Sequence, residues 1–143
     1  MFRKFITGRI MIPVLLCAQI VPLLIFPPST FSIATQEWWL PAFLALLTIV
    51  SLVQVLVRRE LAAWPWYLLS FSQGLNIISR LMMLFPHATH TVKGGGEVAN
   101  GSYIVIAFVA MLFSVFEIWY GELPEVRQKL AARTLEKPSA LEA

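Results

Sequence analysis

Four long runs of apolar residues, separated by short polar stretches, dominate the chain. They cover residues 10–26, 38–57, 66–85 and 103–120. Each run is 17 to 20 residues long, which in a helix measures about 26–30 Å, close to the thickness of a hydrocarbon core. In lipid every backbone polar group must be bonded within the chain, so the runs predict transmembrane helices rather than strands. Pro13 and Pro22 lie inside the first run and predict a kink there.

The composition excludes a soluble or a disordered chain. Of 143 residues, 58% are hydrophobic and only 13% are charged, whereas a soluble domain carries about 25% charged residues. The mean hydropathy is +0.74. We therefore expect an all-α, polytopic integral membrane protein with four transmembrane helices in a bundle. The membrane domain would cover 1–122, and the short charged tail 123–143 would carry at most a brief amphipathic helix beginning at Pro124.

The basic residues predict the orientation of the chain. Nine of them fall at the N-terminus, in the loop after the second run and in the tail: Arg3, Lys4, Arg9, Arg58, Arg59, Arg127, Lys129, Arg133 and Lys137. Lys93 alone falls in the loops on the other side. The positive-inside rule then places both termini in the cytoplasm, and we expect a bacterial cytoplasmic membrane. All Trp and Tyr residues lie near run ends, at the depth that these side chains prefer.

Two features of the first run allow further predictions. Residues 32–34 (Ser-Ile-Ala) resemble a signal-peptide cleavage site, but the apolar core is longer than a signal peptide needs, so we favour an uncleaved anchor. Cys17 is the only cysteine, which excludes an intramolecular disulfide and a Cys-rich metal site, and we expect a buried small apolar side chain. Since the cations follow the topology, their number does not indicate nucleic acid binding.

Polar residues inside the runs are the candidate functional groups, because they are costly in a membrane. The third run places Ser72, Gln73, Asn76, Ser79 and Arg80 within an arc of about 120° on one helix face. Polar residues of the other runs lie at a similar depth, namely Gln19, Thr48 and Ser114. This layer is a path for a solute or a proton, a surface that contacts a cofactor, or a set of hydrogen bonds that hold helices together. We favour the last interpretation.

Arg80 is the most unusual residue of this layer. It lies about 9 Å from the outer end of the third run, so its side chain could snorkel to the outer interface. The alternative is a buried guanidinium that binds a partner subunit, a lipid headgroup or a ligand carboxylate. The acidic candidates on that side of the membrane are Glu37 and Glu97, both in loops.

Glu117 lies one turn from the inner end of the fourth run. A hydrogen bond to Gln54 or an ion pair with Arg58 would satisfy it. A carboxylate that binds a proton or a cation is the alternative.

His87 and His90 follow the third run, and their spacing makes them weak candidates for a metal site. A third ligand near them is missing from the pattern, and Gly94, Gly95 and Gly96 predict a flexible loop. We therefore expect no metal and no other cofactor. The chain contains no Asp, and neither a Ser-His-Asp nor an HExxH arrangement is visible, so we do not expect an enzyme.

These observations favour a non-catalytic accessory, stabilising or assembly subunit of a larger membrane complex. Its partners would be the lipid bilayer and other membrane subunits or further copies of itself. The alternative is a transport component for a small solute or ion that forms its pathway by oligomerisation. The residues that would line this pathway are Gln73, Asn76, Arg80 and Glu117. A small membrane enzyme or cofactor-binding subunit that uses His87 and His90 is the weakest hypothesis.

Overall fold

The computed structural model describes residues 1–25 and 38–139, and the side chains up to residue 136. The protein is mostly helical, at 77%. Three helices are long and apolar enough to cross a membrane: Trp39–Val57, Trp64–His87 and Gly101–Glu122. Over an 18-residue window within each helix the mean hydropathy is 2.4, 1.3 and 2.1, respectively, which indicates a membrane protein. The expected C-terminal end of the first run, the loop at 27–37 and the last residues of the tail lie outside the described residues.

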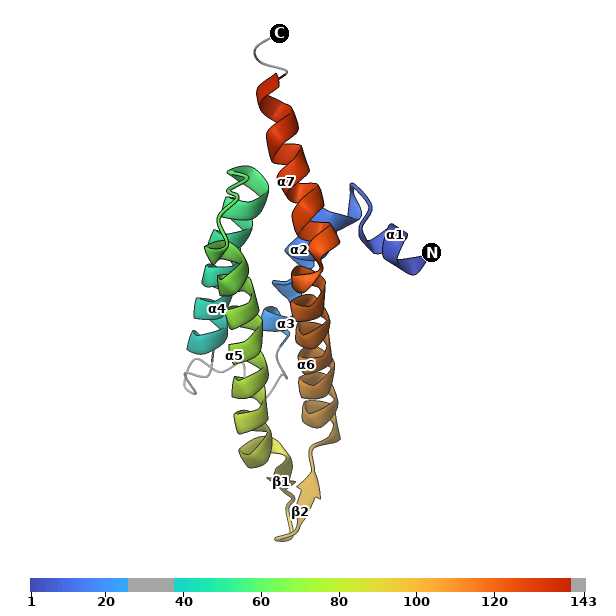
Figure 1. Cartoon of the computed structure of the whole chain (residues 1–143). Helices are drawn as coiled ribbons and strands as arrows, with labels where there is room; N and C mark the ends of the chain where they lie inside the picture. Colours follow the sequence, from blue (N-terminus) through green and yellow to red (C-terminus); the bar gives the residue numbers. More distant parts are fainter. Residues whose placement is uncertain (26–37, 140–143) are drawn as a thin grey trace.

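The three long helices lie along one another, as Figure 1 shows. Helix α4 (Trp39–Leu52) continues into one turn of π-helix (Val53–Val57), and α5 (Trp64–His87) packs against both α4 and α6 (Gly101–Glu122). Pro65 and Asn100 fit the starts of α5 and α6, since a proline is tolerated in a first turn and the Asn100 side chain accepts a bond from the Tyr103 N–H. The expected runs thus correspond to these helices within two residues at each end.

The first apolar run is divided, where the sequence predicts one kinked helix. It forms α2 (Met11–Ala18) and the single turn α3 (Val21–Leu24), after the short α1 (Phe2–Ile6). At the break, Gln19 and Ile20 donate to the carbonyls three residues earlier, and Ile25 is extended. The physical reason is Pro22, which cannot donate a backbone bond. The described helical part, Met11–Leu24, measures about 21 Å by its rise, less than one hydrocarbon thickness.

A small β-hairpin joins α5 to α6, where the sequence predicts only a loop. Strand β1 (Thr89–Thr91) pairs antiparallel with β2 (Glu97–Ala99) in a two-stranded sheet. Gly94 and Gly95 have φ values of 133° and 85°, which other residues rarely adopt, so these glycines make the turn possible. The structure is therefore not purely helical, although the hairpin is the one departure among the described residues.

The largest apolar core lies at the end of the bundle where α6 meets α7 (Pro124–Ser139). Residues from α1, α2, the α4–π helix, α5, α6 and α7 contribute to it: Ile6, Ile12, Leu16, Leu52, Val55, Trp66, Leu69, Tyr120, Leu123 and Val126. The Tyr120 hydroxyl donates to the carbonyl of Ile6 at 2.8 Å, and Lys129 Nζ donates to the carbonyl of Thr7 at 2.7 Å. These two bonds fix the N-terminal segment against the last two helices.

The outer faces of the helices are apolar. Large exposed side chains include Phe43 on α4, Phe71 on α5 and Leu112 on α6, as expected for helices in contact with lipid or with another membrane protein. The prediction that Cys17 is buried is wrong, because its side chain is exposed on α2. It belongs to the outward face of that helix, opposite the buried Ile12, Leu16 and Gln19.

Candidate functional site

The polar residues singled out in the sequence gather inside the bundle. Gln19, Gln73, Asn76, Arg80 and Glu117 are all buried. So are the neighbouring hydroxyl residues Thr48, Ser51, Ser72 and Ser114. One face of α5 supplies the central members, at positions 73, 76 and 80, because residues three and four apart lie above one another on a helix. This face is directed at the divided first helix and at α6.

Gln73 bonds to a backbone carbonyl at the break of the divided helix. In a continuous helix the Gln19 carbonyl would accept from the N–H of Leu23. That N–H instead donates to the carbonyl of Ile20 at 3.1 Å. Gln73 Nε2 takes its place and donates to the Gln19 carbonyl at 2.7 Å. A side chain of α5 thus satisfies a backbone acceptor that no water can reach within a membrane.

Asn76 joins three helices at the next level. Its Nδ2 donates to Ser114 Oγ on α6 at 2.9 Å and to the carbonyl of Pro22 at 3.4 Å. Its Oδ1 accepts from Arg80 Nε at 3.1 Å. Since hydrogen bonds of this kind between membrane helices are worth about 0.6–2 kcal/mol each, Asn76 is a strong tie between α3, α5 and α6.

Arg80 is directed into the bundle and is only 7% exposed. Its Nη2 donates to the carbonyl of Pro22 at 2.7 Å and also to that of Ile25. Both acceptors belong to the end of α3, where the last carbonyls have no partner within the helix. The expectation that Arg80 snorkels to the outer interface is therefore wrong. Of its two acidic candidates, Glu37 lies outside the described residues and Glu97 is on the exposed strand β2.

Glu117 differs from the other polar residues, because its carboxylate has no hydrogen-bond partner among the described residues. It is 1% exposed. The predicted bond to Gln54 is not formed, and Gln54 Oε1 also has no partner among them. Arg58, the other expected partner, has an exposed side chain at the end of the π-helical turn. Glu117 thus stays a buried acidic group with unused acceptors.

A narrow cavity lies beside Glu117, and Gln19 and Gln73 also line it. It is too narrow to admit a water molecule. The amide oxygens of these two glutamines also have no partner in the described part of the chain. The site therefore presents several oxygen acceptors, a set that suits a proton or a small dehydrated cation.

The two histidines lie apart from this polar interior. His87 ends α5, where its ring stacks on Tyr103 with 5.1 Å between ring centres and its Nδ1 lies 3.0 Å from the Met83 carbonyl. His90 lies on β1, opposite Val98. Within residues 1–25 and 38–139, no group of three or more His, Cys, Asp or Glu side chains comes together.

Sequence reasoning found the side chains of the polar network but missed its backbone acceptors. The carbonyls of Gln19, Pro22 and Ile25 belong to the backbone, and only the break in the first helix makes them available. Two signals in the sequence point towards them: Pro22 inside an apolar run, and polar residues spaced at 73, 76 and 80 on a facing helix.

Comparisons with known proteins add no identity. No protein-family model matches the chain, and neither a curated protein nor a solved structure gives a significant match.

Replacing Arg80 tests whether the polar network holds the divided helix. Arg80→Met leaves buried carbonyls unpaired, so the free energy of unfolding is expected to fall by about 2–4 kcal/mol. Unfolding of the full chain in mixed detergent micelles, followed by tryptophan fluorescence, measures this. The matched control is Arg58→Met, which removes an exposed guanidinium and should change stability by less than about 0.5 kcal/mol. An equal loss in both variants would contradict the assigned role.

Proposed function

We propose that the chain crosses the membrane four times, with both termini in the cytoplasm. Three crossings correspond to helices of sufficient length. The fourth would be the divided helix α2–α3 together with the residues that follow it. The support is its apolar composition and the nine cations that the first, third and last polar stretches share. If the first segment did not cross, the N-terminus and the tail would lie on opposite sides.

Labelling of single cysteines on intact cells tests this topology. In a Cys17→Ser background, Val92→Cys in the hairpin loop should react with a membrane-impermeant maleimide. Phe2→Cys and Gln128→Cys should react only after the cells are opened. These three positions are exposed in the structure. Labelling of Phe2→Cys but not of Gln128→Cys on intact cells would show three crossings instead of four.

We infer that the protein is a non-catalytic accessory, stabilising or assembly subunit of a larger membrane complex. The observation that carries this proposal is how the polar side chains are used. Gln73, Asn76 and Arg80 bond to the chain's own first helix and to α6, which supports a structural role for them. The surfaces that remain available for a function are then the exposed apolar faces of the helices, such as those around Phe43 and Phe108. Such faces suit lateral packing against another membrane protein.

Purification from native membranes tests the subunit proposal. A C-terminal tag, a mild detergent and mass determination should recover a stoichiometric complex that contains other membrane proteins. Phe108→Ala on α6 or Phe43→Ala on α4 should lower partner recovery several-fold, while the abundance of the tagged chain stays constant. The comparison of these two variants identifies the face that binds. A stable, monodisperse preparation without partners would contradict the proposal.

A second candidate function is transport of a small ion by an oligomer of this chain. The specific observation that favours it is Glu117, a buried carboxylate with no hydrogen-bond partner in the described residues, beside a narrow cavity. A proton or a small cation would satisfy the oxygen atoms that meet there. Buried ionisable groups in membrane helices commonly mark ion pathways.

Flux through proteoliposomes tests this candidate. Glu117→Gln keeps the shape of the side chain but removes its capacity to exchange a proton or to balance a cation. Ion flux driven by a potassium diffusion potential, read with a pH-sensitive dye, should then fall at least tenfold. The matched control is Glu122→Gln, an exposed carboxyl residue on the same helix, which should leave flux unchanged. Equal flux in the two variants would exclude Glu117 as an ion site.

A further inference from the structure

Three arginines from different parts of the chain meet at the end of the bundle that carries most cations. Arg9 precedes α2, Arg59 lies in the connection between α4 and α5, and Arg133 is on α7. Together they line an open hollow of about 660 Å³. Ile10 and Pro13 contribute apolar surface to the same hollow. Glu136 is its one acidic lining residue, so three positive charges face one negative charge there.

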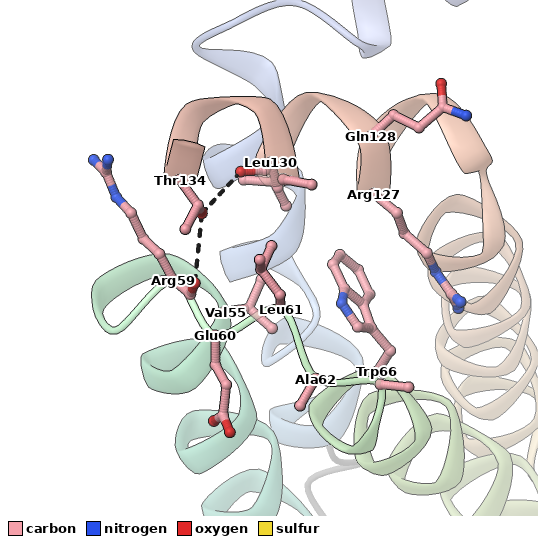
Figure 2. A pocket seen from close by; sticks show the side chains of 12 residues that line it. Val55, Arg59, Glu60, Leu61, Ala62, Trp66, Arg127, Gln128, Leu130 and Thr134 are labelled. Carbon is pink, nitrogen blue, oxygen red and sulfur yellow. Dashed lines mark hydrogen bonds between the residues drawn. The ribbon is translucent and has the colours of Figure 1, made fainter. Parts of the chain in front are cut away.

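Hydrogen bonds from side chains to backbone carbonyls hold these like charges close together. Arg133 Nη2 donates to the carbonyl of Arg9 at 2.6 Å, and Arg59 Nη1 donates to the carbonyl of Arg133 at 3.3 Å. The Thr134 hydroxyl lies 3.4 Å from the carbonyl of Arg59 and 3.1 Å from that of Leu130, the two contacts drawn in Figure 2. Arg59 has a φ of 54°, an uncommon conformation for a residue with a side chain. The segments are therefore fixed to one another by hydrogen bonds from side chains to backbone carbonyls, two of them donated by the arginines themselves.

The charges of the three guanidinium groups are not neutralised by these bonds, because carbonyl oxygens carry no net charge. Each guanidinium has five N–H donors, and the contacts described use one donor of Arg59 and one of Arg133. Arg127 differs from these three arginines because its charge is paired: it forms an ion pair with Glu122 at 2.9 Å and stacks on Trp66. The hollow thus combines unused donors with positive potential, and an anion there would lower the repulsion.

We propose that this hollow binds the phosphate group of an anionic phospholipid. Guanidinium groups match phosphate oxygens in pairs of parallel hydrogen bonds. Basic pockets between membrane helices on the cytoplasmic side bind acidic lipid headgroups. Ile10 and Pro13 stand where the first apolar run begins, so they would contact the glycerol and the upper acyl chain once the phosphate is seated. This apolar floor favours a lipid over a soluble phosphate.

A neighbouring pocket is distinguished from this site by its lining. It encloses about 310 Å³ and shares only Arg59 with the hollow. In Figure 2 the Arg59 side chain extends away from Trp66, which stands between Arg59 and Arg127. Its lining combines apolar residues such as Val55, Leu61 and Leu130 with the guanidinium of Arg127 and the carboxylate of Glu60. Since Arg127 pairs with Glu122, the neighbouring pocket offers fewer uncommitted cations than the hollow, and the hollow is therefore the better site for a phosphate.

Native mass spectrometry of the full chain in mild detergent, titrated with defined lipids, tests the proposal. Phosphatidylglycerol should remain bound at concentrations where phosphatidylcholine, which has no net charge, does not. Arg9→Gln should weaken phosphatidylglycerol binding about tenfold, the loss expected for one charged hydrogen-bonded contact. Arg59→Gln should have a similar effect, and the double variant should bind no better than it binds phosphatidylcholine.

The matched control is Arg58→Gln. It removes the same charge at the residue next to Arg59, and Arg58 does not line the hollow. It should leave phosphatidylglycerol binding unchanged. Equal loss in Arg58→Gln and Arg9→Gln would overturn the proposal in favour of a general basic surface. Equal binding of the two lipids would also overturn it.

If inorganic phosphate competes as well as phosphatidylglycerol does, the occupant is a soluble anion and the lipid assignment fails. Unfolding curves of each variant show that a loss of binding is not a loss of fold.

Discussion

Hydrogen bonds from α5 to the backbone of the divided first helix are the interactions on which the rest of the structure depends. A helix break inside a membrane leaves carbonyl groups that water cannot satisfy, and each such group costs several kcal/mol. Gln73 and Arg80 supply the missing donors at 2.7 Å each, to the carbonyls of Gln19 and Pro22. Without them, these carbonyls would be buried next to α5 with no donor to pair with.

This use of polar side chains separates two groups of residues that look alike in the sequence. Asn76 and Ser114 bond to each other across α5 and α6, and with Gln73 and Arg80 they make a connected network. Glu117 lies in the same interior but has no bonded partner among the described residues. The first group maintains the arrangement of helices. Glu117 is destabilising where it stands, and this makes it the residue to examine for an ion.

The two ends of the bundle are built differently. At the hairpin end, α5 and α6 are joined by a short sheet and by the stacking of His87 on Tyr103. At the opposite end, the apolar core, the Tyr120–Ile6 bond and the contacts of α7 bring several segments together. That end also holds Arg9, Arg59 and Arg133 around one hollow. The concentration of positive charge at this end of the bundle thus also forms a defined surface with its own shape.

Apolar periodicity and charge by themselves determined the positions of the three long helices, the membrane character of the chain and the polar face of α5. These properties depend on residues close together in sequence, and hydrophobic burial in lipid imposes them locally. The tertiary structure alone decided the rest. Whether Arg80 is directed outwards or inwards depends on where the carbonyls of Pro22 and Ile25 lie, and no sequence pattern encodes the position of a backbone acceptor in a neighbouring helix. Likewise, Cys17 is exposed and Glu117 unpaired because of how α2 and α6 are rotated against their neighbours, and only packing in three dimensions sets that rotation.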